Sequence, residues 1–175
     1  IPTSDIAVAD EPDVPPTQKA IFAFGLTGSY VSTSNLVSSS GVVASDVTGV
    51  GTGRNLLAAA GYGTDKAIFA YGTTGSLVSM SNLVNNSGVV ASDVTGVGTA
   101  RRGLDAAEYG TDKAIFGYGY GGSNVSLTNL VNNSGVIASD VTGVGTARQG
   151  VAATGYGVDT AIFAYGYVSG NLSMS

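Results

Sequence analysis

The sequence contains no cysteine, no histidine and no tryptophan among its 175 residues. Without cysteine, a disulfide framework and a thiolate metal site are both excluded. Without histidine, a Ser-His-Asp triad, a Cys-His pair and a histidine-ligated zinc site are excluded as well. Only carboxylates, hydroxyls and amides remain for chemistry. We therefore expect no catalytic residue, no cofactor and no metal site, and a protein that is not an enzyme.

Charge is also scarce, with 7 Lys and Arg against 12 Asp and Glu, for a formal net charge of −5. A basic stripe that could follow a phosphate backbone is lacking, so nucleic acid is not expected as a partner. No apolar run approaches the roughly 20 residues that cross a bilayer, which argues against membrane insertion. The 27 glycines, with only 4 prolines and 43% hydrophobic residues, are typical of short folded elements separated by turns.

Most of the chain is a tandem repeat with a period of 47 residues. The motif Lys-Ala-Ile-Phe begins at Lys19, Lys66 and Lys113, and Thr160 begins its fourth copy. Residues 63–109 and 110–156 differ at only 12 of 47 positions. A strict period of this length indicates units that bury their apolar faces against one another. We predict one repeat domain over residues 17–175, with units that start near 17, 64, 111 and 158.

One unit contains the signals of four short strands. In the third unit these are residues 113–119, 124–131 and 136–140, and residues 150–156 begin the next unit. A helix is the alternative for residues 56–60, which are good helix formers. However, the run is far shorter than the ~12 residues that an isolated helix needs, so a strand is favoured. The prediction is an all-β fold.

Four strands per unit of this length are typical of a β-propeller blade, with a β-solenoid or open repeat array as the alternative. The run AIFGYGYGG at 114–122 and the GVGTAR linkers at 96–101 and 143–148 resemble kelch repeats, although tryptophan is lacking. More narrowly, the runs TDKAIFxYG and SNLVxNSGVVASDVTGVGTAR resemble kelch-like repeats in structural proteins of marine tailed phages and related environmental viruses. The resemblance implies a kelch-like β-propeller of four blades in a virion or extracellular setting, with other virion or surface proteins as partners.

The two ends of the repeat suggest how such a ring closes. The fourth unit lacks residues for its last strand, whereas residues 4–10 have the pattern of residues 40–46. We therefore expect residues 1–16 to be an extended segment that includes a closing strand. The alternative is that another subunit supplies the missing strand, which would make the protein a homo-oligomer.

Differences between units indicate where a ligand could bind, because positions that vary are not required by the repeated fold. They gather in the turn between the first two expected strands, which is residues 120–122 in the third unit, and around Arg102, Asp105 and Glu108. Aromatic rings beside polar groups suit sugar or protein contact. The candidate ligand face comprises Tyr30, Thr73, Thr74, Tyr120 and Tyr167, together with Arg54, Arg101 and Arg148.

Two sets of recurring charged residues have a structural interpretation that we favour. Each of the three arginines just named could hold an anion, but bonds to neighbouring carbonyls or to Asp are the preferred interpretation. Asp46, Asp93 and Asp140 could suggest calcium, yet none has a second carboxylate nearby, which favours turn capping. Asp105 and Glu108 are a weak candidate for a glycosidase pair.

The leading functional hypothesis is a non-enzymatic structural or recognition module, most simply a virion surface, fibre or decoration component. The first alternative is a secreted or cell-surface propeller that binds glycans. The second alternative is a self-assembling filament or surface-layer repeat protein, because low-charge β runs offer strand edges for pairing.

Overall fold

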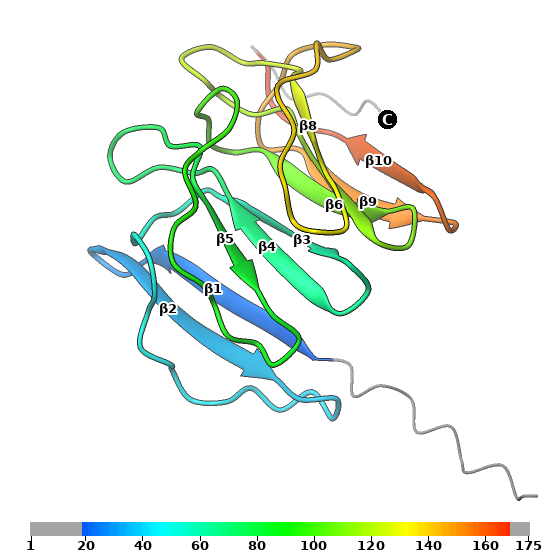
Figure 1. Cartoon of the computed structure of the whole chain (residues 1–175). Coiled ribbons are helices and arrows are strands. Elements are labelled where there is room, and N and C mark those ends of the chain that lie inside the picture. Colours follow the sequence, from blue (N-terminus) through cyan, green and yellow to red (C-terminus); the bar gives the residue numbers. More distant parts are fainter. Residues whose placement is uncertain (1–18, 169–175) are drawn as a thin grey trace, which may run out of the picture.

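The computed structural model describes residues 19–168 and shows an all-β chain, as the sequence predicts. Over these residues there is no helix, and ten strands form four small antiparallel sheets. Each sheet comes from one repeat unit, and the sheets follow one another in chain order (Figure 1). Helices long and apolar enough to cross a membrane are not found in the part of the chain described. The expected closing strand in residues 1–16 lies outside the described residues.

The two middle units have three strands each, and the outer units have two. The first unit consists of β1 (Ala20–Leu26) and β2 (Tyr30–Val37). The second and third units consist of β3 (Ala58–Tyr62), β4 (Lys66–Ala70) and β5 (Ser81–Val84), and of β6 (Asp105–Tyr109), β7 (Lys113–Gly117) and β8 (Thr128–Val131). The fourth unit consists of β9 (Ala152–Tyr156) and β10 (Thr160–Ala164).

The alanine-rich run that could have formed a helix is a strand. Ala58 pairs with Ala70 and Tyr62 pairs with Lys66 in an antiparallel register between β3 and β4. Just before this strand, Leu56 has a φ of 53°, which an α-helix does not accommodate. The small side chains let β3 lie against β6 and β6 against β9. Packing between units, rather than intrinsic helix propensity, therefore determines this element.

In the first three units, the fourth expected strand is reduced to two isolated bridges. In the third unit Thr128 pairs with Val141 and Val131 pairs with Ile137. Between these two bridges β8 advances by three residues and the opposite segment by four, which is the geometry of a β-bulge. The Asn129 side chain donates a hydrogen bond to the Ala138 carbonyl at 3.0 Å. A side chain thus replaces part of the backbone ladder, and the segment at 136–140 is less regular than its sequence predicts.

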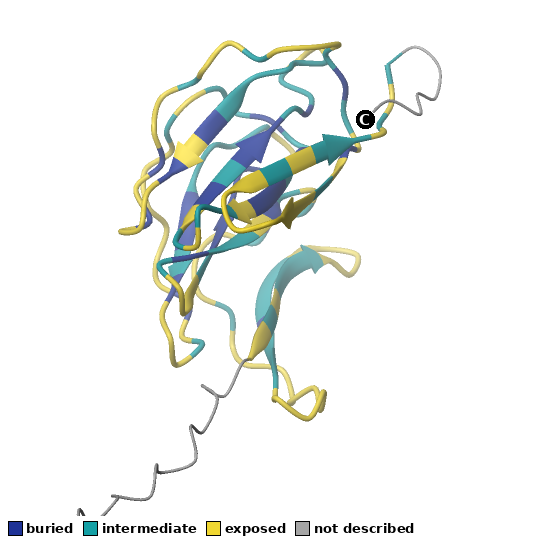
Figure 2. Cartoon of the chain, turned by 90° about the vertical axis from the view of Figure 1, so that its right-hand side faces the viewer, coloured by how far each residue is buried: buried dark blue, intermediate teal, exposed yellow. Residues whose placement is uncertain are grey.

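The main core lies between the second and third units. It includes Ile68 and Tyr71 of one unit and Ala114, Phe116 and Val131 of the next, all almost completely buried. Figure 2 shows that buried residues concentrate in these middle units, whereas the β1–β2 hairpin is half-buried or exposed along most of its length. Each unit therefore depends on its neighbours for a core, as is usual in repeat proteins.

Candidate functional site

The three recurring arginines lie inside the molecule, where they bond to backbone carbonyls. Arg54 Nε donates to the Tyr71 carbonyl at 2.9 Å, and Arg101 Nε donates in the same way to Tyr118 at 2.9 Å. Arg148 Nη2 donates to the Phe163 carbonyl at 3.1 Å. All three side chains are buried. The interpretation that each arginine bonds neighbouring carbonyls or Asp agrees with these contacts, and the buried guanidinium groups are not accessible to a dissolved anion.

An aspartate, a threonine and an asparagine complete the Arg54 and Arg101 sites. In the third unit Asp140 accepts hydrogen bonds from the Thr99 hydroxyl at 2.6 Å and from Asn129 Nδ2 at 2.9 Å, and it lies 3.9 Å from Arg101 Nη1. The Thr99 backbone N–H also donates to this carboxylate, at 3.0 Å. These contacts join the two ends of one unit, so the aspartate caps backbone and holds the unit closed. We call this arrangement the clasp.

The second unit contains the same clasp, made by Thr52, Asn82, Asp93 and Arg54. Burial lowers the pKa of Arg54 to about 10 although Asp93 opposes this shift, so the guanidinium remains a cation at neutral pH. Burial raises the pKa of the Asp93 carboxyl, but hydrogen bonds from Thr52 and Asn82 outweigh this effect and the net pKa is lowered. Asp93 is therefore an anion held by structural contacts, and it has little capacity left for calcium.

The positions that differ between units come together in pairs at one place in each unit. Isolated backbone bridges join Asn55 to Thr73, Arg102 to Tyr120, and Gln149 to Tyr167. Successive pairs are 47 residues apart in the sequence and lie in nearly identical segments of the repeat. The same backbone therefore carries three chemically different pairs. We call these three pairs the variable row.

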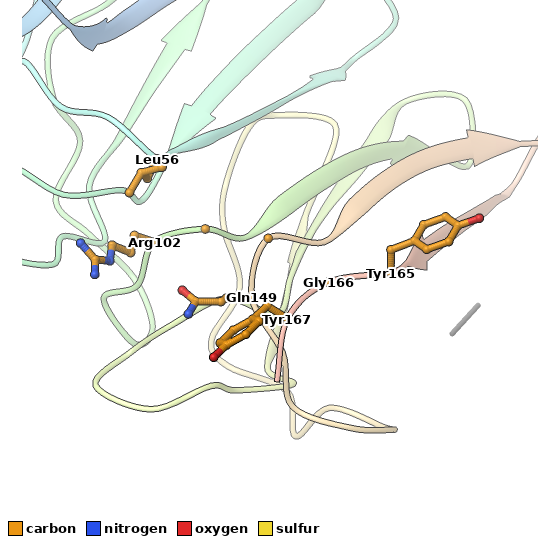
Figure 3. A pocket seen from close by; sticks show the side chains of 8 residues that line it. Leu56, Arg102, Gln149, Tyr165, Gly166 and Tyr167 are labelled. Carbon is orange, nitrogen blue, oxygen red and sulfur yellow. The ribbon is translucent and has the colours of Figure 1, made fainter. Parts of the chain in front are cut away.

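A pocket of about 540 Å³ opens beside the last two pairs of the row. Side chains of Leu56, Arg102, Gln149, Tyr165 and Tyr167 line it, together with three glycines (Figure 3). The glycine backbones of neighbouring units are joined here, because Gly103 N–H donates to the Leu56 carbonyl and Gly150 N–H to the Gly103 carbonyl. The pocket therefore has a rigid backbone wall and a rim of one guanidinium, one amide and two phenol rings.

Further contacts hold the rim side chains. The Arg102 guanidinium lies 5.6 Å from the centre of the Tyr120 ring, within the range of a cation–π interaction. Asn124 Nδ2 donates to the Tyr167 carbonyl at 3.1 Å. Arg102, Gln149 and Tyr120 are half-buried, and the Tyr167 side chain is exposed. These groups are held in position while their polar atoms remain close to solvent.

The structure brings together only part of the candidate ligand face. Tyr120 and Tyr167 lie in the variable row. Thr73 is also in the row, but its side chain is buried and its hydroxyl donates to the Ser76 carbonyl at 3.1 Å. Thr74 follows it in the same turn and is half-buried. Tyr30 starts β2, outside the row, with its carbonyl beside Gly53.

The candidate ligand face predicted from the sequence does not include Gln149, Tyr165 or Leu56, which also line the pocket. Gln149 occupies the same repeat position as Arg102, so variation at that position was a signal that could have identified it. Leu56 also lies at a varying position, because its counterparts are Gly103 and Gly150, whereas Tyr165 carries no such signal. Only the folded array brings residues of the second and fourth units to one pocket.

Comparison with known proteins finds no matching family model and no matching curated sequence. The chemistry of the site is thus the main basis for a functional proposal. Asp105 and Glu108 do not face one another, because residues three apart on β6 point to opposite sides of the sheet. The Asp105 carboxylate instead accepts backbone hydrogen bonds from Ala106 and Ala153. Over residues 19–168, no group of three or more acidic residues could hold a metal ion.

A second hollow, of about 390 Å³, lies between the third and fourth units. Leu130 and Val141 contribute to its largely apolar lining. In the preceding units the leucine equivalent to Leu130 packs against a turn glycine, as Leu83 does against Gly135. This hollow therefore corresponds to a packing position between units.

Proposed function

We propose that the chain is a non-enzymatic recognition module, and that it binds its ligand at the variable row and the adjoining pocket. The observation that supports this proposal is the difference among the three residue pairs, Asn55 with Thr73, Arg102 with Tyr120, and Gln149 with Tyr167, on a backbone that is otherwise repeated. A purely structural repeat has no need for different chemistry at these positions. The absence of histidine and cysteine from the sequence supports binding rather than catalysis.

The rim chemistry favours a glycan as the ligand. Phenol rings stack against the apolar faces of sugars, while guanidinium and amide groups donate hydrogen bonds to hydroxyls or to a sugar carboxylate. The pocket volume of about 540 Å³ lies within the usual range for small-ligand sites. The positive charge of Arg102 beside two tyrosines favours an acidic sugar over a neutral one.

Each of the sheets also fits a kelch-like propeller blade, which we propose as the finer description of the fold. The support is that the first strands β3, β6 and β9 are neighbours and that backbone hydrogen bonds join their leading residues. A virion surface or fibre is the proposed setting, and it rests on the resemblance of the repeat to phage structural proteins. In such a setting, a rigid module with one ligand face would serve attachment.

A glycan array tests the binding proposal, with a double variant designed from the protein itself. Replacing Arg102→Asn together with Tyr120→Thr gives the third unit the pair that the second unit already carries, so the backbone should be retained. We expect wild-type protein to bind acidic glycans in a saturable way and the double variant to lose at least tenfold in affinity. Asn86→Ala, in an exposed turn, is the control and should bind normally.

Two results would contradict the proposal. One is an array without any saturable binding, and the other is binding that the double variant retains in full. Turnover of a bound glycan would contradict the non-enzymatic assignment, so bound oligosaccharides should be recovered and their length checked.

A further inference from the structure

Neighbouring units meet through the same aromatic pair each time, and we call this contact the seam. An aromatic ring near the end of β1, β4 or β7 contacts a phenylalanine inside the equivalent strand of the next unit, which is β4, β7 or β10. The three pairs have ring centres 5.5, 5.5 and 5.6 Å apart, and they are Phe24 with Phe69, Tyr71 with Phe116, and Tyr118 with Phe163. An arginine of the second unit in each pair stacks on the first ring at 4.1 to 4.2 Å.

A backbone hydrogen bond accompanies every seam. The glycine after the first ring donates to the carbonyl of the stacked arginine, as Gly72 does to Arg101 at 2.9 Å, and the bonds from Gly25 and Gly119 have the same length. Each seam is therefore a repeated, directional contact. One unit presents the ring near the end of β1, β4 or β7. The next unit presents the phenylalanine within β4, β7 or β10.

The ring that each unit presents to the next is held in an unfavourable backbone conformation. Phe24, Tyr71, Tyr118 and Tyr165 have φ values of 65°, 66°, 63° and 60°. Bulky residues rarely adopt positive φ, and each such residue costs about 1–3 kcal/mol. Packing in the seam offsets this cost for the first three rings. Tyr165 has the same strained backbone without a phenylalanine beside it among the described residues.

Both sides of the seam are left uncovered at the two ends of the described array. The Tyr165 side chain is 59% exposed, whereas its counterpart Tyr71 is 0% exposed. Phe22 is 63% exposed, whereas its counterparts Phe69 and Phe116 are 5% and 0% exposed. Because each is a copy of one half of an internal contact, the two uncovered faces are complementary to each other.

We propose that a second copy of this chain covers these faces in a head-to-tail contact, in which Tyr165 of one copy packs against Phe22 of the next. Such a contact is heterologous, so repetition extends the array until it closes or forms a filament. Closure within one chain would bury both rings in the monomer, but both are exposed in the structure of the single chain. A second copy supplies both halves without any change inside the units.

The contact between copies should be weaker than an internal seam. In the first unit the position equivalent to the stacked arginine is Ala7, so the new seam lacks the guanidinium. Cation–π contacts of desolvated groups contribute about 2 kcal/mol, and their loss makes assembly dependent on concentration. Association should therefore appear on concentrating the protein.

Light scattering coupled to size-exclusion chromatography tests the contact, with Phe22→Ser and Tyr165→Ser as separate variants. Wild-type protein should gain average mass above that of one chain as its concentration rises, and each variant alone should remain a monomer. Mixed together, the two variants should form a 1:1 dimer and nothing larger, because only one intact contact remains. Val158→Ser, at a side chain 73% exposed, should assemble like wild type.

A second measurement avoids dependence on the stability of the serine variants. The chain has no native cysteine, so Ala20→Cys and Ala164→Cys each introduce a unique thiol beside the seam while Phe22 and Tyr165 stay in place. Their internal counterparts, Ala67 and Ala23, pack in one cluster across a seam. A short bis-maleimide should link the two variants to each other far more than it links either variant to itself. A wild-type monomer at all concentrations, equal self-linking, or a mixture that stays monomeric would overturn the proposal.

The two proposals can fail separately although Tyr165 also borders the pocket. The glycan test changes Arg102 and Tyr120, and the assembly test changes Phe22 and Tyr165. Glycan binding by wild-type protein that stays monomeric would contradict only the assembly proposal. Assembly of wild-type protein that binds no glycan would contradict only the binding proposal.

Discussion

At the scale of single residues, the clasp explains why the linker between units is so uniform. Thr99, Arg101, Asn129 and Asp140 are separated in sequence but make one network of hydrogen bonds and a long ion pair. A buried guanidinium is tolerated only where its donors are satisfied and a counter-charge is near. The recurrence of the motif therefore reflects a requirement of folding rather than of ligand binding.

Replacing Asp140→Ala should lower the free energy of unfolding by about 2–3 kcal/mol, because it removes the counter-charge of the buried Arg101 and one hydrogen-bond acceptor of Thr99 and Asn129. Asp46→Ala is a matched control, since among the described residues the Asp46 side chain accepts a hydrogen bond from Asn35 alone. That variant should lose less than about 1 kcal/mol. Urea unfolding of the three proteins measures the difference, and equal losses would show that the clasp has no special role.

At the scale of elements, close contacts of glycine set the path of the linkers. A side chain at Gly143 would overlap the Ser126 carbonyl oxygen, and the equivalent Gly96 lies against Ser79 in the same way. The linker thus crosses the chain just before β8, and residue 143 has no room for a Cβ atom. This crossing brings Thr146 and Arg148 to the fourth unit.

Gly143→Ala should therefore destabilise the protein by about 1–3 kcal/mol, which is the usual cost of overpacking. Gly121→Ala is the comparison, because a Cβ there meets its nearest atom, Thr99 Cγ2, at 3.2 Å, which is a much smaller overlap than at Gly143. Thermal unfolding followed by circular dichroism distinguishes the two variants. A larger loss in Gly121→Ala would mean that the linker relaxes freely around residue 143.

At the scale of the whole molecule, carboxylates of two units should act together in acid. Burial raises the pKa of both Asp93 and Asp140, but hydrogen bonds from threonine and asparagine outweigh it and lower each pKa below its ordinary value of 3.8. A carboxyl with a lowered folded pKa adds stability above its unfolded pKa, and this stability is lost as the pH falls through the folded value.

The melting temperature should therefore change little between neutral pH and about pH 5, and it should fall once the pH drops below about 4. Asp140→Ala removes one of the two carboxyls and should show a shallower fall. A pH series of thermal melts measures both. An equally steep fall in that variant would place the acid sensitivity elsewhere in the chain.

The sequence by itself determined the 47-residue period, the all-β class and the positions of most strands. These depend on local patterns of apolar, small and turn residues that repeat four times. It did not determine the fourth strand of each unit, because the Asn129 side chain replaces backbone pairing there. It also identified Tyr120 and Tyr167 as variable but left Gln149 and Leu56 out of the candidate site.

Only the tertiary structure decided that the recurring arginines are buried, that the variable positions pair beside a pocket, and that Phe22 and Tyr165 are exposed. Such contacts join residues 17 to 41 or more positions apart, for example Arg101 with Tyr118 and Thr99 with Asp140. Their distances depend on how whole sheets pack. A repeated sequence predicts identical units, but packing makes the end units different, because each internal face is covered by a neighbour and the last faces are not.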